Sequence, residues 1–92
     1  MTKKLEIVVL GRVQGIGYRA YTLKIAQRLR IRGYVKNQAD GSVKVLAIGD
    51  EDQTNEFIGY LKKGPAFSLV REMSVNEVEA AVERYQDFRV EY

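Results

Sequence analysis

The chain has 92 residues, enough for one small domain that buries ~60% of its unfolded surface and too few for two independent cores. Hydrophobic residues make up 46% and charged residues 29%, with a net charge of +3, which is typical of a soluble globular protein. The absence of cysteine and histidine excludes disulfides and thiolate chemistry and removes the commonest general base. No secretory leader pattern and no apolar run of membrane length is present, so we expect a cytoplasmic protein.

The first third of the chain predicts a strand, a loop and a helix. Residues 5–10 (LEIVVL) are rich in β-branched residues and predict a strand, which a glycine-rich segment then ends. Residues 1–4 precede this strand and are expected to fray. Apolar residues next recur at helical spacing, which predicts a helix from Tyr18 to Arg30, with Gly33 marking its exit.

Turn and cap signals predict the middle of the chain. Residues 33–37 and 42–49 form two strand-like runs around an Asp-Gly turn, so they should pair as an antiparallel hairpin. The sequence DEDQ at 50–53 is a capping-box pattern and predicts the start of a second helix. The Gly-Pro pair at 64–65 should end that helix.

The last elements complete a recognisable order. Residues 69–78 predict a fourth strand, although helix formers in 76–84 leave its end ambiguous, and the alternation in 88–92 predicts a short final strand. The order is βαββαβ plus a short C-terminal edge strand. We therefore predict an α+β fold: a ferredoxin-like split-βαβ sandwich with an antiparallel sheet and two helices on one face.

The segment GRVQGIGYR at 11–19 carries the main functional signal. Backbone N–H groups in a turn at a helix N-terminus point at a shared centre, where the helix dipole also favours an anion. Arg19 lies at the unfavourable end of this dipole for a cation, costing ~0.3–1 kcal/mol unless an anion sits between it and the amides. The segment therefore predicts a phosphate cradle; the alternative is a plain tight turn beside a solvated arginine.

The same segment also has the GxGxxA spacing of dinucleotide-binding loops, through Gly15, Gly17 and Ala20. Such a site needs a parallel βαβ unit in a larger sheet, whereas this chain runs directly from its second strand into a hairpin. The carboxylates at 50–52 are explained by the helix start. We therefore predict no cofactor and no metal.

Two segments, GRVQGIGYR at 11–19 and GYVKNQADGSVKVLAIG at 33–49, resemble the signature segments of the acylphosphatases at the usual separation. The resemblance covers nearly the whole chain and implies a single acylphosphatase-like domain over residues 1–92. It implies hydrolysis of the carboxyl-phosphate bond of an acyl phosphate to a carboxylate and inorganic phosphate, without a metal.

The resemblance also assigns roles to residues. Arg19 corresponds to the phosphate-binding arginine and Asn37 to the asparagine that positions the attacking water. Arg30 stands where relatives often have a glycine, so the exit of the first helix is expected to be strained or rerouted. The expected substrate-binding residues are those of the loop: Gly15, Ile16, Gly17, Tyr18 and Arg19.

Other interpretations remain open from the residues alone. Asn37 before an Asp-Gly turn is as often a turn residue, and the competing function is a non-catalytic ferredoxin-like module that binds an anionic metabolite or phosphate group. A third alternative is the acylphosphatase-like domain that begins larger maturation enzymes. Because the chain ends at Tyr92, we expect a separate small protein instead. The basic residues of 28–32 suit a helix end better than a nucleic-acid stripe, so we expect no nucleic acid. Since no apolar run reaches membrane length and the helix faces are polar, we also expect no membrane and a monomer.

Overall fold

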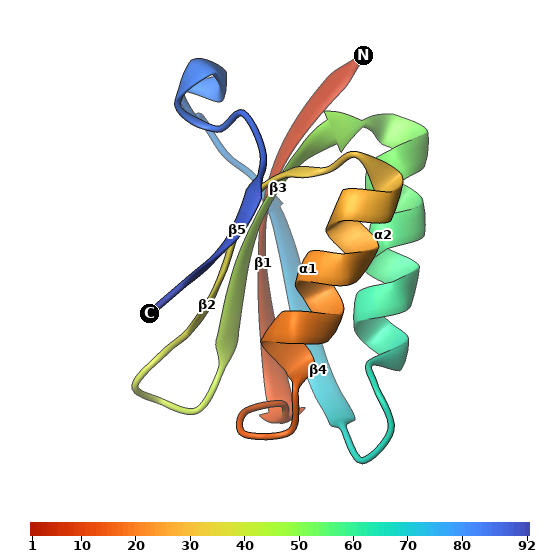
Figure 1. Cartoon of the computed structure of the whole chain (residues 1–92), viewed down its shortest axis with the longest axis vertical. Helices are drawn as coiled ribbons and strands as arrows, with labels where there is room; N and C mark the ends of the chain where they lie inside the picture. Colours follow the sequence, from red (N-terminus) through yellow and green to blue (C-terminus); the bar gives the residue numbers. More distant parts are fainter.

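The computed structural model describes all 92 residues. They form five strands, two α-helices and one short 3₁₀ helix, joined by loops (Figure 1). In chain order the elements are β1 (Thr2–Arg12), α1 (Tyr18–Leu29), β2 (Arg32–Asn37), β3 (Val43–Asp50), α2 (Glu51–Lys63), β4 (Leu69–Glu77), η1 (Val82–Arg84) and β5 (Phe88–Glu91). The order matches the predicted βαββαβ arrangement with a C-terminal edge strand. No helix is long and apolar enough to cross a membrane.

The strands form one sheet in the order β4-β1-β3-β2-β5. β1 pairs antiparallel with both β3 and β4, and β2 pairs antiparallel with β3. The predicted antiparallel sheet is wrong for the last pair, because β5 runs parallel to β2 and the sheet is mixed. After β4 the chain crosses to the opposite edge and reverses direction, and no local sequence signal encodes that path.

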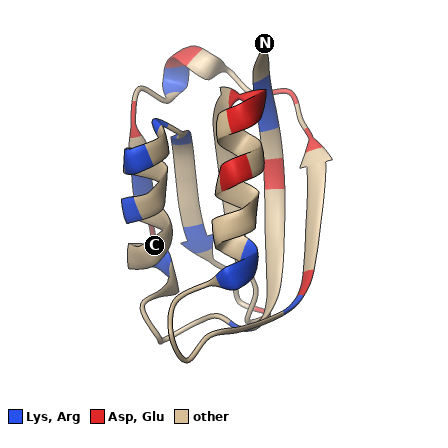
Figure 2. Ribbon diagram, turned by 90° about the vertical axis from the view of Figure 1, so that its right-hand side faces the viewer, with Lys and Arg blue, Asp and Glu red and all other residues tan.

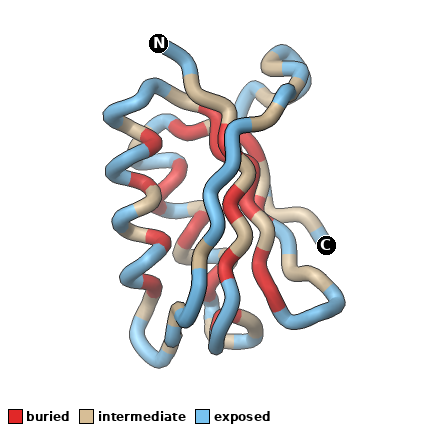
Figure 3. Tube along the Cα trace, turned by 180° about the vertical axis from the view of Figure 1, so that it is seen from behind, coloured by how far each residue is buried: buried red, intermediate tan, exposed pale blue.

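Both helices pack on the same face of the sheet, as predicted (Figures 1 and 2). Buried and partly exposed positions alternate along β1 because successive side chains point to opposite faces, whereas β3, the middle strand, is buried continuously over residues 45–48 (Figure 3). Each large apolar side chain buried here contributes about 1.5–3 kcal/mol. The shared core includes Leu5, Ile7 and Val9 of β1, Val43, Val45 and Ala47 of β3, Ile25 and Ala26 of α1, and Phe57 and Leu61 of α2.

Two details of the start and of the first helix differ from the prediction. Residues 2–4 do not fray: Thr2 pairs with Asp50 in the sheet, and Lys3 Nζ lies 3.0 Å from Glu77 Oε1. Gly33 does not mark the exit of α1, which ends at Leu29; it lies within β2, as the strand-like run of residues 33–37 predicts, and a Cβ there would collide with the carbonyl oxygen of Leu46. Long-range pairing with β3 holds residues 2–4 in the sheet, and local sequence patterns do not report it.

The exit of α1 is strained, as the resemblance implied. The helix ends at Leu29, and Arg30 follows in the left-handed region with φ 59°. A non-glycine residue in this conformation costs roughly 1–2 kcal/mol. The N–H groups of Arg30 and Ile31 close the helix end by donating to the carbonyls of Gln27 at 3.3 Å and Ala26 at 2.9 Å.

Candidate active site

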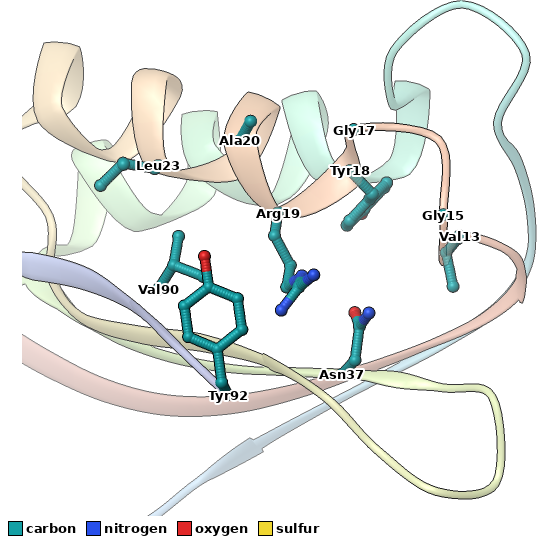
Figure 4. Close-up of a pocket in the computed structure, with 10 residues that line it drawn as sticks. All are labelled: Val13, Gly15, Gly17, Tyr18, Arg19, Ala20, Leu23, Asn37, Val90 and Tyr92. Atoms are coloured by element: carbon teal, nitrogen blue, oxygen red, sulfur yellow. The ribbon is translucent and has the colours of Figure 1, made fainter.

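The two segments singled out from the sequence meet at one end of the sheet. β1 and β2 both run antiparallel to β3, so they point in the same direction and their carboxyl ends lie at the same end of the sheet. The loop of residues 13–17 leaves β1 there, and Asn37 ends β2 opposite Val43. A cavity of about 330 Å³ lies at this end, lined by Val13, Gly15, Gly17, Tyr18, Arg19, Ala20, Leu23, Asn37, Val90 and Tyr92 (Figure 4).

The loop presents unpaired backbone donors. Gly15 and Gly17 adopt φ values of 76° and 83°, which glycine tolerates without steric strain. No N–H group from Gly15 to Ala20 donates a hydrogen bond within the chain, and Tyr21 is the first in α1 to do so, bonding the Gly17 carbonyl at 3.0 Å. Since these donors lie at the positive end of the helix dipole, the loop can accept an anion.

Arg19 projects from the first turn of α1 into the centre of the cavity (Figure 4). Helical side chains lean toward the N-terminus of their helix, which directs this guanidinium to the loop side. It makes no ion pair with any carboxylate, and its Cζ lies 4.7 Å from the centre of the Tyr92 ring. A cation held against an aromatic face keeps its in-plane N–H donors free for a ligand.

Asn37 points from the end of β2 toward Arg19 (Figure 4). Its Oδ1 is buried and has no hydrogen-bond partner, although the residue lines the cavity. Leaving a buried carbonyl oxygen unpaired costs about 1–3 kcal/mol. The amide is therefore available to a ligand or a water, and it is not occupied in stabilising the hairpin turn.

The other predicted loop residues contribute through the backbone. The ring of Tyr18 is buried under α2, where its hydroxyl donates to the Leu61 carbonyl at 2.7 Å. Burial raises the pKa of the Tyr18 hydroxyl above its usual value of 10.0, so this group stays protonated near neutral pH. The side chain of Ile16 packs against the hydrophobic core and does not line the cavity.

Sequence reasoning missed the wall of the cavity opposite the loop. Ala20 and Leu23 of α1, with Val90 and Tyr92 at β5, form this apolar side. The alternation of residues 88–92 predicts a strand but does not say which strand it pairs with. Parallel pairing of β5 with β2 is what brings Tyr92 to Arg19. No local pattern marks such a contact.

The chemical repertoire of the cavity is narrow. Arg19 is the only charged side chain among the lining residues, and no carboxylate competes with an incoming anion. The site offers a cation, backbone donors and one amide, but no carboxylate, histidine or lysine side chain to act as a general acid or base. It can hold a phosphate and orient a small molecule beside it.

Comparison with known proteins gives consistent matches over the whole chain. A family model described as Acylphosphatase matches residues 5–90. An acylphosphatase of Archaeoglobus fulgidus is 43% identical over 88 residues, which cover 96% of this chain and 97% of that protein. The crystal structure of acylphosphatase from Bacillus subtilis has a TM-score of 0.92 at 37% identity, with 100% of both chains covered.

A longer protein contains a similar region. The crystal structure of full-length HypF in its phosphate- and nucleotide-bound form has a TM-score of 0.90 at 31% identity, covering 100% of this chain and 12% of that chain. The same fold therefore also occurs as a small part of a much larger protein.

Proposed function

Because the chain belongs to the acylphosphatase family and hydrolyses acyl phosphates, we propose how its residues divide that reaction between them. Arg19 and the amides of residues 15–19 hold the phosphoryl group, and Asn37 orients the attacking water. The substrate-binding segment is then Gly15, Ile16, Gly17, Tyr18 and Arg19. Residues 1–92 form a single acylphosphatase-like domain.

The observation that carries this proposal is the unpaired Oδ1 of Asn37. A buried amide oxygen without a protein partner, beside an arginine without a carboxylate partner, supports a site where a water and a phosphate are held together. Oδ1 accepts a hydrogen bond from the water and so fixes its position. The water then attacks phosphorus from the side of β2.

The leaving group explains why so few residue types suffice. The leaving group of an acyl phosphate is a carboxylate, whose conjugate acid has a pKa of about 4, so it departs without a proton from the enzyme. The phosphoryl group passes through a loose transition state whose charge lies on its equatorial oxygens. Arg19 and the loop amides stabilise that charge, which is the larger part of catalysis in such a site.

The proton of the attacking water goes to a phosphate oxygen of the substrate. Asn37 is neutral and too weak a base to accept it, and no residue that lines the cavity has a carboxylate side chain. Water therefore supplies oxygen to phosphorus, the P–O bond to the carboxylate breaks, and inorganic phosphate leaves with the proton.

We place the enzyme in the cytoplasm as a monomer whose partners are an acyl phosphate and the phosphate product. Polar exposed faces on both helices support the monomer, with acidic residues at the start of α2 and basic residues at its end (Figure 2).

The proposal is tested by benzoyl phosphate hydrolysis in EDTA, comparing wild type with Arg19→Ala and Arg28→Ala. Arg28 lies in the last turn of the same helix and is the matched control. We expect wild type and Arg28→Ala to turn over equally and Arg19→Ala to lose at least about 10³-fold, as when a transition-state arginine is removed.

Two results would contradict this assignment. Wild-type turnover by Arg19→Ala would mean that the phosphoryl group is held elsewhere. Turnover that disappears in EDTA and returns with a divalent metal would mean that these residues alone do not perform the reaction.

A further inference from the structure

Gln14 connects the two segments of the site. Its Nε2 donates two hydrogen bonds, to the carbonyl oxygens of Gln38 and Ser42, each at 2.8 Å. Gln14 directly precedes the cradle glycine Gly15, and Gln38 directly follows Asn37. One side chain therefore joins the phosphate loop to the end of the strand that carries the water-orienting amide.

The hairpin does not need this contribution to close its own turn. The Gln38 N–H donates to the Ser42 carbonyl at 2.8 Å, and the Gly41 N–H donates to the Gln38 carbonyl at 3.1 Å. The Asp40 carboxylate accepts from the Ser42 N–H at 3.0 Å and from its hydroxyl at 2.6 Å. Both carbonyls that receive Gln14 are thus already engaged in the turn, and Gln14 adds a bond from outside it.

No other hydrogen bond joins the loop to this hairpin. The ladder between β1 and β3 ends at Val9 and Val43, and beyond it the loop of residues 13–17 leaves the sheet. The two bonds of Gln14 are the hydrogen bonds that span from that loop to residues 36–43. Gln14 is therefore the hydrogen-bonded link between the loop and the hairpin.

We propose that Gln14 is a positioning residue, which sets the placement of the phosphate cradle relative to Asn37. The inference rests on the proposed roles of the loop and of Asn37 and adds a residue to which no role in the reaction was assigned. Gln14 is not among the residues that line the cavity. It acts by holding both halves of the site in register, so that the oriented water lies in line with the phosphorus.

The expected signature is a loss of turnover without a loss of phosphate binding. Without Gln14 the loop amides and Arg19 still surround the phosphate, so the affinity for inorganic phosphate is kept. The loop shifts relative to Asn37, and a displacement of about 1 Å in an oriented site costs on the order of 10²-fold in rate. A purely structural role would lower stability and leave kcat of the folded protein unchanged.

The test is a double-mutant cycle of wild type, Gln14→Met, Asn37→Ala and the double variant. Each is assayed for kcat with benzoyl phosphate and for the Kd of inorganic phosphate. Methionine keeps the length of the side chain and removes the donors. The control is Gln53→Met, the same exchange at a glutamine that bonds backbone in α2, away from the site.

We expect Gln14→Met to lose on the order of 10²-fold in kcat with an unchanged phosphate Kd, and Gln53→Met to keep both. In the Asn37→Ala background the Gln14 exchange should have no further effect on kcat, because it acts through Asn37. If Gln14→Met folds poorly, Gln14→Ala removes the same donors and gives the same comparison.

Three results would overturn the inference: wild-type kcat in Gln14→Met, loss of phosphate affinity in parallel with kcat, or an equal loss of kcat with and without Asn37. A failure of the proposed function looks different, because Asn37→Ala alone would then keep the wild-type kcat.

Discussion

The two helices pack on the same sheet face but begin in opposite ways. At the start of α2, the Asp50 N–H donates to Gln53 Oε1 at 3.1 Å, and Glu51 and Asp52 occupy the first turn. At the start of α1, the cap is Gly17 with φ 83°, there is no side-chain cap, and the first turn holds Arg19 with no acidic residue.

This difference separates a helix start built for stability from one that can accept a ligand. Acidic side chains and a capping box satisfy the N–H groups and complement the dipole of α2. The start of α1 leaves its N–H groups unpaired and adds a cation, an arrangement that an anion between them would stabilise. The helix start that is less favourable for stability, that of α1, is therefore the one that borders the cavity.

The largest effect is expected when the start of α1 is made to resemble that of α2. Arg19→Glu should abolish turnover, by at least about 10³-fold, because it repels the phosphoryl group. Its stability should stay within about 1 kcal/mol of wild type, since the gain with the dipole offsets the lost Tyr92 contact. Benzoyl phosphate assays and urea unfolding measure the two quantities.

Arg28→Glu, at the other end of α1, supplies the control for this exchange. It should lose ~0.3–1 kcal/mol because a basic residue in the last turn complements the dipole, and it should keep full turnover. Equal losses of turnover in the two variants would remove the distinction between the helix ends.

A smaller effect is expected from matched glycine exchanges. A Cβ at Gly17 or at Gly59, inside α2, meets no atom within 4 Å, so the variants differ in backbone conformation alone. Gly17→Ala should lose roughly 1–2 kcal/mol because it forces alanine to φ 83°. Gly59→Ala should gain about 0.4–1 kcal/mol. Thermal unfolding measures the stability of the two variants. A Gly17→Ala variant as stable as wild type would show that the cradle does not require the φ of 83° at this residue.

An effect on stability alone is expected at the start of α2. Gln53→Met removes one hydrogen bond from the cap and should lose about 0.5–1.5 kcal/mol in urea unfolding. Turnover should not change, since the start of α2 lies outside the cavity. A loss of activity here would connect the α2 cap to the site and weaken the contrast between the helices.

Much of the fold could be predicted because its signals are local. The DEDQ capping pattern and the apolar spacing of α1 depend on neighbouring residues alone, and both helices begin where expected. The direction of β5 could not be predicted, because it depends on the path of the chain after β4.

The candidate site divides in the same way. The glycines and Arg19 lie within one short segment, so the cradle could be predicted from that segment. The contact of Tyr92 with Arg19 and the bonds of Gln14 to the hairpin join residues far apart in the chain. They depend on strand order, which the sequence pattern does not report, and the role of Asn37 remains a prediction from the family resemblance and the unpaired Oδ1.

The central claim is that the start of α1 binds phosphate while Asn37 serves the water, and one variant tests it directly. For Asn37→Ala, kcat with benzoyl phosphate and the Kd of inorganic phosphate are measured on the same preparation. We predict that kcat falls by on the order of 10²-fold or more, because the water is no longer oriented, while the phosphate Kd stays near that of wild type. A wild-type kcat, or a phosphate affinity lost together with kcat, would contradict the division of roles.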